Sequence, residues 1–146
     1  MPGDDRQTTW LSGELGELIA AGPLAHLTTI NPDGSPQVSV IWIGLDGEEV
    51  VSGHMGRNLK VRNIERDPRV ALSFVAPHEP DVFLNPYAVL RASARVTSGG
   101  AWDLLNRLAK VYMGPEQEFP APKGDGGFVI RYTVERVAGV GPWATR

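Results

Sequence analysis

The clearest chemical signal in the sequence is a basic segment at residues 57–69. Its charged side chains are Arg57, Lys60, Arg62, Arg66 and Arg69, with Glu65 and Asp67. Five basic and two acidic groups give the segment a charge of +3, whereas the other nine basic and fifteen acidic groups of the chain give −6. A basic segment in an otherwise acidic protein predicts a binding site for an anion such as a phosphate.

The spacing within this segment favours the same chemistry. Arg57 and Lys60 are three residues apart, so they would share one face of a helix. They lie where that helix should begin, and a helix N-terminus favours an anion through its free N–H groups and its dipole. Gly53 and Gly56 would let the preceding backbone approach a phosphate closely. The alternative is a solvated basic helix face with surface ion pairs, and the residues alone do not decide between the two.

Other kinds of catalytic site are missing from the sequence. It has no cysteine, no Gly-x-Ser-x-Gly turn, no Walker phosphate loop and no Gly-x-Gly-x-x-Gly motif after a strand. Its histidines lie far apart without a His-Glu-x-x-His motif, so no metal site is predicted. We expect His54 and His78 to be surface or loop histidines. If the protein is an enzyme, a bound cofactor and no catalytic side chain carries the chemistry.

Three aromatic residues have more than one reading. Trp42 lies among alternating apolar residues, which favours the core over a cofactor-facing position. Tyr87 follows Asn85-Pro86 and is expected to enter a strand with its ring packed. Trp143 could cap the fold, pack across a dimer or line a pocket.

These residues must be positioned by short elements separated by clear turn signals. An amphipathic helix is predicted over 9–20 and ends at Gly22-Pro23. Strands are predicted over 24–30, 37–43 and 48–52, with turns at Asn31–Gly34 and Asp46-Gly47. We expect these three strands to form an antiparallel meander.

The remainder of the chain continues this alternation. A helix is predicted over 57–67 and cannot continue past Pro68. A second helix should follow Gly99-Gly100 and end at Gly114-Pro115. The predicted strands are 70–75, 87–96, 128–133 and 136–140, and the predicted loops are 76–85 and 116–126. Together these elements predict a mainly β (α+β) fold, a small antiparallel barrel of at least six strands with peripheral helices.

Composition limits the class of protein. The chain has 146 residues, 42% of them hydrophobic, with 17 Gly, 12 Pro and a net charge of −3. This length predicts one domain over 1–146, and the hydrophobic content is sufficient for a core. The small net charge gives no reason to expect nucleic acid as a partner. No signal peptide or membrane-length apolar run is visible, so we expect a soluble, cytoplasmic protein.

Four segments in this order resemble a known superfamily. They are residues 27–40 (LTTINPDGSPQVSV), residues 57–70 (RNLKVRNIERDPRV), Asn85-Pro86-Tyr87, and residues 133–137 (TVERV). The chain is similar to the split-barrel flavin and deazaflavin oxidoreductases, the superfamily of pyridoxamine 5′-phosphate oxidase. Within this superfamily, the chain is more similar to the B group, the deazaflavin-dependent reductases that use coenzyme F420. The resemblance extends from Pro23 to Trp143 and implies a split β-barrel of six or seven strands.

The resemblance implies a set of cofactor-binding residues. The ring would lie along Gln37, Val38, Ser39, Val40 and Trp42, the cofactor tail beside Ser52, Gly53 and His54, and the phosphate against Arg57, Asn58 and Lys60. A homodimer is implied, with the second subunit completing the site. Tyr87, Arg91 and Trp143 are the candidates for contacts of that kind.

The resemblance also implies a reaction. Reduced deazaflavin coenzyme F420 would pass a hydride to a conjugated acceptor such as an enone, a quinone or a tetrapyrrole-like pigment. One alternative is an FMN-binding oxidase or flavin reductase of the same fold. Another is a module that binds deazaflavin or haem without turnover. The loop 77–84 is longer and more apolar than expected in close relatives, and this region tends to shape substrate entry.

Overall fold

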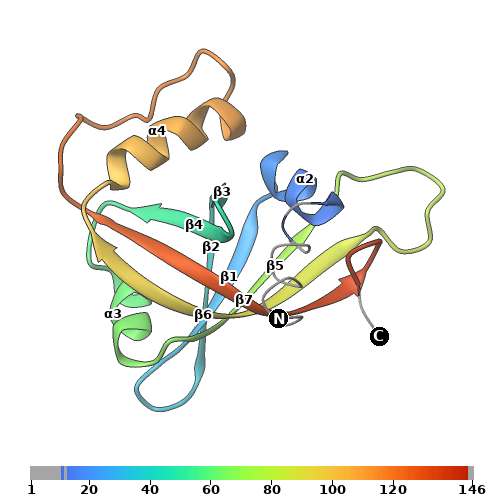
Figure 1. Cartoon of the computed structure of the whole chain (residues 1–146), viewed down its shortest axis with the longest axis horizontal. Coiled ribbons are helices and arrows are strands. Elements are labelled where there is room, and N and C mark those ends of the chain that lie inside the picture. Colours follow the sequence, from blue (N-terminus) through green and yellow to red (C-terminus); the bar gives the residue numbers. More distant parts are fainter. Residues whose placement is uncertain (1–10, 12, 145–146) are drawn as a thin grey trace.

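The computed structural model describes residue 11 and residues 13–144, which form one sheet with three helices around it (Figure 1). In chain order the elements are α2 (Glu14–Ala20), β1 (Ala25–Ile30), β2 (Pro36–Ile41), β3 (Gly44–Asp46), β4 (Glu49–His54), α3 (Leu59–Arg66), β5 (Arg69–Val75), β6 (Tyr87–Ser98), α4 (Ala101–Tyr112) and β7 (Phe128–Val140). The mainly β class with peripheral helices is confirmed. No described helix is long and apolar enough to cross a membrane.

The sheet has seven antiparallel strands in the order β2-β1-β5-β6-β7-β4-β3. β2 and β3 follow one another in the chain yet lie at opposite ends of this order. The sheet is therefore open between them, as a split barrel requires. β7 is the last described strand in the chain, and it pairs with both β6 and β4 in the interior of the sheet.

Two of the predicted strand arrangements are wrong. The three-stranded meander does not form, because β4 pairs with β3 and β7 and makes no pairing with β2. The turn at Asp46-Gly47 does form, but it joins β4 to the three-residue strand β3. The two predicted closing strands are one strand of 13 residues, β7. Its pairing with β6 shifts register between Arg91 and Ala92, where a bulge accommodates one extra residue on β7.

The apolar side chains form two clusters on the two faces of β4. Val50 lies in the main cluster, with buried residues from α2, α3 and all strands of the sheet except β3. Val51 lies on the opposite face with Leu104 and Leu108 of α4 and Val129 of β7. Because successive side chains of β4 point to opposite faces of the sheet, Val50 packs in the barrel interior and Val51 packs against α4. This places the end of β4 between α3 and α4.

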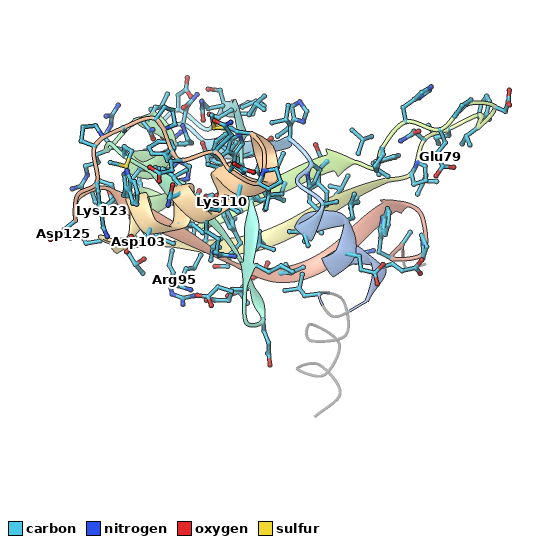
Figure 2. The ribbon with its side chains drawn as sticks, turned by 90° about the horizontal axis from the view of Figure 1, so that it is seen from above. Glu79, Arg95, Asp103, Lys110, Lys123 and Asp125 are labelled. Atoms are coloured by element: carbon cyan, nitrogen blue, oxygen red, sulfur yellow. The ribbon has the colours of Figure 1, made fainter. Side chains whose placement is uncertain are left out.

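The predicted loop between β5 and β6 projects from the molecule, with Glu79 near its end (Figure 2). The base of this loop is held by Asn85, whose side-chain amide donates to the carbonyl of Ala76 at 2.7 Å. Phe83 is fully exposed, and its neighbours Val82 and Leu84 are exposed as well. The loop is therefore hydrogen-bonded at its base and exposes three apolar side chains farther out.

Candidate functional site

An open pocket of about 260 Å³ lies where the first strands of the sheet meet α3, α4 and the loop after α4. Its lining residues are Leu24, Val40, Ile41, Trp42, Gly53, His54, Lys60, Leu105 and Phe119. We call it the Lys60 pocket. Five residues predicted to bind a cofactor line it: Val40, Trp42, Gly53, His54 and Lys60. They come from three segments that are separate in the sequence.

Lys60 lies in the first turn of α3, whose N-terminus is capped by the side chain of Asn58. The Asn58 Oδ1 atom accepts a hydrogen bond from the Val61 N–H at 3.4 Å. The ammonium group of Lys60 makes no ion pair or hydrogen bond with any residue that the structure describes. Burial lowers the pKa of its ammonium group below the usual range. A half-buried cation without a counter-ion at a helix N-terminus is suited to an anionic ligand.

Trp42 forms an aromatic wall of the pocket. Its ring stacks on Tyr112 of α4, with centroids 5.1 Å apart and planes 8° apart, and Phe119 meets it edge-on at 6.4 Å. Tyr112 is held in turn, because its hydroxyl donates to the Pro23 carbonyl at 2.6 Å and accepts from the Ile43 N–H at 3.0 Å. Trp42 is therefore partly buried in a cluster and also faces the pocket.

Sequence reasoning did not single out Tyr112, Leu105 or Phe119 as neighbours of the site. Tyr112 and Leu105 lie in α4, the helix that was predicted between Gly99-Gly100 and Gly114-Pro115 without a role at the site. A signal for their role does exist: α4 must cover some face of the sheet, and Gly53 is one position where a missing side chain permits a close approach. Phe119 lies in a loop without periodicity, and nothing local predicts its position.

Gly53 has a packing role that differs from the predicted one. A Cβ atom at this position would lie 2.9 Å from Leu105 Cγ and 3.2 Å from the carbonyl oxygen of Ala101. The missing side chain therefore lets α4 approach β4 closely. At Gly56 a Cβ atom would meet nothing within 4 Å. The group that approaches the backbone closely at Gly53 is therefore α4, whereas a phosphate was predicted there.

His54 corrects another expectation. It is 6% exposed and ends β4, whereas a surface or loop histidine was predicted. Its Nε2 atom lies 2.7 Å from the hydroxyl oxygen of Ser52, which lies 2.8 Å from the hydroxyl of Tyr132. Burial, and to a lesser extent the charge of Lys60, lower the pKa of His54 to about 4. His54 is neutral at pH 7, and Ser52 is fully buried behind it.

Arg57 and Lys60 do not converge in the way that a shared helix face predicts. α3 begins at Leu59, so Arg57 precedes the helix. The guanidinium Nη2 of Arg57 pairs with both carboxylate oxygens of Glu65, at 2.7 and 2.8 Å, and its side chain is 58% exposed. Arg57 also lies over the ring of Phe128, 5.9 Å from its centroid. It does not line the Lys60 pocket.

The predicted residues of β2 lie on an edge of the sheet. Val38 and Val40 are each 57% exposed, although they are apolar. Gln37 and Ser39 alternate with them, and the Gln37 amide donates to the Ser39 hydroxyl at 2.9 Å. Val40 lines the pocket, whereas Gln37, Val38 and Ser39 continue the strand beyond it. Val38 and Val40 thus form an exposed apolar strip that begins at the pocket and continues along β2.

Tyr87, Arg91 and Trp143 are not brought to the pocket within one chain. The indole N–H of Trp143 donates to the Tyr87 carbonyl at 2.8 Å, so these two lie together at the start of β6. Arg91 is an exposed residue farther along the same strand. A role for them at a cofactor would require another subunit.

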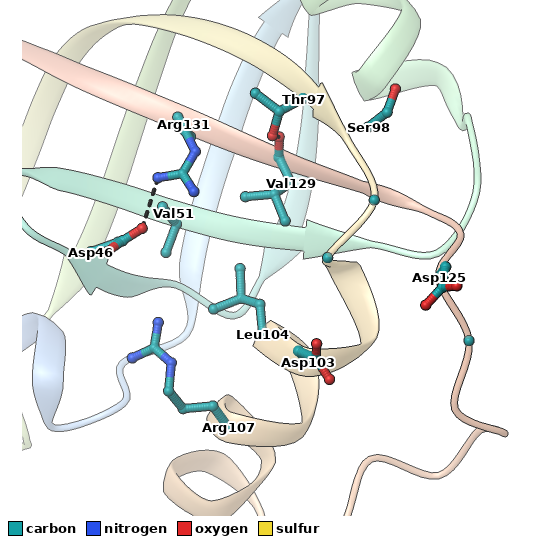
Figure 3. Close-up of a pocket in the computed structure, with 13 residues that line it drawn as sticks. Asp46, Val51, Thr97, Ser98, Asp103, Leu104, Arg107, Asp125, Val129 and Arg131 are labelled. Carbon is teal, nitrogen blue, oxygen red and sulfur yellow. Dashed lines mark hydrogen bonds and ion pairs between the residues drawn. The ribbon is translucent and has the colours of Figure 1, made fainter.

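A second and larger pocket, of about 480 Å³, lies on another side of α4 (Figure 3). It is lined by side chains of both signs, including Asp46 and Arg131, which form an ion pair at 2.8 Å, and Asp103 and Arg107 of α4. None of the predicted cofactor residues lines it. Because three acidic residues, Asp46, Asp103 and Asp125, outnumber the two arginines, this pocket does not favour an anion. The Lys60 pocket is therefore the candidate site.

Comparisons with known proteins agree with the split-barrel fold described above. The family model described as pyridoxamine 5′-phosphate oxidase matches residues 11–141. A solved structure described as an F420 reductase is 30% identical, with a TM-score of 0.70, covering 84% of this chain and 94% of that chain. No protein in the curated set matches the chain.

More distant structures share the fold. HupZ from Group A Streptococcus is 18% identical with a TM-score of 0.64, covering 92% of this chain and 98% of that one. A heme binding protein from Mycobacterium smegmatis is 21% identical with a TM-score of 0.63, covering 96% of this chain and 54% of that one. Because the family model spans most of the sequence and the strand order is that of an open barrel, the chain belongs to the pyridoxamine 5′-phosphate oxidase-like, split-barrel superfamily.

Proposed function

We propose that the protein is an oxidoreductase that holds the deazaflavin coenzyme F420 in the Lys60 pocket. The observation that carries this proposal is Lys60, a half-buried cation with no partner among the described residues, in a pocket walled by Trp42 and Phe119. A phosphate would supply the missing counter-charge, and a flat ring would suit the aromatic and aliphatic wall. The 30% identity to an F420 reductase favours this cofactor.

The chain's own residues would bind and orient the cofactor and exclude water. Lys60 would hold the phosphate, and Val40, Trp42 and Leu105 would cover the ring with apolar surface. When bound in its reduced form, the deazaflavin supplies a hydride to a conjugated acceptor such as an enone, a quinone or a tetrapyrrole-like pigment. No side chain need act as a nucleophile, because orientation and exclusion of water are what the protein contributes.

The size of the pocket supports a homodimer as part of this proposal. Pockets that enclose ligands of this size usually measure at least about 300 Å³, and the Lys60 pocket measures about 260 Å³ and is open. Val40 lines this pocket, and Val38 continues the exposed apolar surface of β2 beyond it. A second copy that covers this strip would add the missing wall, and it could bring Tyr87, Arg91 or Trp143 toward the site.

FMN is the alternative cofactor. It carries the same phosphate, so Lys60 would serve it equally well, and the family description fits an FMN oxidase or flavin reductase. A module that binds deazaflavin or haem without turnover is the other alternative, since a structural neighbour is described as a heme binding protein. The three cases differ in absorbance spectrum and in turnover with added acceptors.

The experiment is a fluorescence and absorbance titration of the protein with F420, FMN and haem, followed by a panel of acceptors. We expect F420 to bind most tightly and its reduced form to be oxidised by at least one conjugated acceptor. Tighter binding of FMN or haem, or binding of F420 without turnover across the panel, would overturn the proposed reaction.

A variant pair tests the site itself. Lys60→Ala should weaken cofactor binding by about 1.5–3 kcal/mol, because a charge-assisted contact is lost. Lys110→Ala is the matched control, since Lys110 is exposed on α4 and donates only to backbone carbonyls. Arg57→Ala should have a smaller effect, because Arg57 would first have to leave Glu65. Equal affinity of the Lys60→Ala and Lys110→Ala proteins would rule out the Lys60 pocket.

A further inference from the structure

Three buried polar groups behind the Lys60 pocket form a chain whose hydrogen-bond direction can be worked out. Tyr132 and Ser52 are fully buried, and His54 is 6% exposed and lines the pocket. Ser52 Oγ lies 2.8 Å from the Tyr132 hydroxyl and 2.7 Å from His54 Nε2. Neither Tyr132 nor Ser52 makes any other side-chain hydrogen bond with the described residues.

Only one direction of this chain satisfies both buried hydroxyl protons. If Tyr132 donates to Ser52, and Ser52 donates to His54 Nε2, each O–H has an acceptor. If His54 Nε2 instead carried the proton and donated to Ser52, either the Ser52 or the Tyr132 O–H would be left without an acceptor. An unsatisfied buried donor is costly, so the first direction is strongly favoured.

This direction fixes the tautomer of His54. Because Nε2 accepts a hydrogen bond, the proton of the neutral ring must be on Nδ1. Nδ1 has no hydrogen-bond partner among the described residues, and no described buried side-chain nitrogen or oxygen lacks a partner. Nδ1 is therefore accessible, and the pocket that His54 lines also contains Lys60. Burial and the charge of Lys60 keep the ring neutral, since they lower its pKa to about 4.

We propose that Ser52 holds His54 in its Nδ1–H tautomer, so that His54 is a neutral hydrogen-bond donor beside Lys60 for an oxygen atom of the bound cofactor. Ser52 is the positioning residue, Tyr132 is the outer donor to Ser52, and His54 is the residue that would touch the ligand. The inference rests on the proposed function only for the identity of the cofactor. Two adjacent donors, one charged and one neutral, would select an oxygen-rich anionic group.

The first test needs no ligand. In nitrogen–proton NMR correlation spectra of the imidazole at pH 7, His54 should show a protonated Nδ1 and an unprotonated Nε2. Ser52→Ala should release the ring, so that the Nε2–H tautomer becomes populated. Tyr132→Phe is the control, since it removes the outer donor but leaves Ser52 free to donate, and it should keep Nδ1–H. An Nε2–H tautomer in the unaltered protein would overturn the inference.

The second test measures binding of F420 and FMN to variants of His54. His54→Asn places an amide N–H near the position of Nδ1–H and should keep the affinity within a few-fold. His54→Leu removes the donor and should weaken binding about tenfold, with Lys60 intact. Equal affinity of the Asn and Leu variants would overturn the role of the donor. If the unaltered protein binds neither cofactor, the proposed function fails, and the tautomer measurement distinguishes that failure from the failure of the lock.

Discussion

The basic residues of segment 57–69 differ in how their charges are used. Arg57 pairs with Glu65 and Arg69 pairs with Asp67, so the two acids of the segment each neutralise one arginine. Arg62 and Arg66 donate to the backbone carbonyls of Arg57 and Ile30. Lys60 is left without a partner among the described residues. Of the five basic residues of this segment, Lys60 alone lines the pocket.

The sequence predicted the position of this site better than its chemistry. Charge and spacing indicated the start of α3, and Lys60 is there. The pairing of Arg57 with Glu65, which keeps Arg57 away from the pocket, could not be predicted, because Glu65 lies eight residues further along the chain, within α3. The burial of His54 depends on the pairing of β4 with β7, in which Phe128, 74 residues away in the chain, lies opposite His54, and no local pattern contains that pairing.

The depressed pKa of His54 predicts how stability depends on pH. The folded-state pKa is about 4, below the ordinary value of 6.5. Between these values the unfolded chain binds the proton and the folded protein does not, so the free energy of unfolding falls as pH falls from 6.5 to 4. The loss should reach about 3 kcal/mol, because one pKa unit corresponds to about 1.4 kcal/mol.

Urea unfolding of the unaltered protein and of His54→Asn across this pH range measures the effect. The asparagine variant retains the carboxylates, which also titrate near pH 4, but lacks the imidazole. We expect its unfolding free energy to vary much less between pH 6.5 and 4. Parallel curves for the two proteins would mean that His54 titrates normally in the folded state.

Among the elements, the boundaries were easier to predict than the pairings. Asn31–Gly34 and Asp46-Gly47 are turns, Pro68 follows the end of α3, and Gly99-Gly100 precedes α4, as predicted from local residues. The partner of β4 was predicted wrongly, because a hairpin signal indicates the next strand but not the far side of a barrel. The long β7 was divided at Glu135, where the bulge interrupts its alternation.

Packing of α4 on β4 gives a prediction at this scale. Gly53→Ala should destabilise the protein by about 1–3 kcal/mol, because the added methyl group would overlap Leu105 and force α4 away from the strand. The same shift should move Leu105 in the wall of the Lys60 pocket and weaken cofactor binding. Thermal unfolding and the cofactor titration measure both effects.

Gly56→Ala is the control for this variant, since its added methyl group would meet nothing within 4 Å. It should change stability by less than about 1 kcal/mol and leave cofactor affinity unaltered. If Gly53→Ala is as stable as Gly56→Ala, then α4 does not rest on the strand as closely as described.

At the scale of the whole molecule, the open side of the barrel leaves a strand edge and apolar side chains exposed. β2 is an edge strand, and Val38 and Val40 expose apolar surface along it. Exposed edge strands with apolar side chains tend to be covered by another chain. The Lys60 pocket opens beside this edge, so covering the edge would also enclose the ligand.

A charge on this strip tests the proposed homodimer. Sedimentation of the unaltered protein should give twice the mass of one chain, and Val38→Lys should shift it toward the monomer, because a lysine would be buried in the interface without a partner. Met113→Lys, at an exposed apolar residue after α4, should remain dimeric. A monomeric unaltered protein with full cofactor affinity would contradict the dimer.

The place of β7 in the sheet has a consequence for biosynthesis. This strand is translated after every other described strand, yet it joins β6 to β4 and carries Tyr132 into the barrel interior. While the chain is still attached to the ribosome, both neighbours present unpaired edges that are open to misassociation. We therefore expect fragments that end before residue 128 to aggregate, whereas a chain that includes β7 should fold.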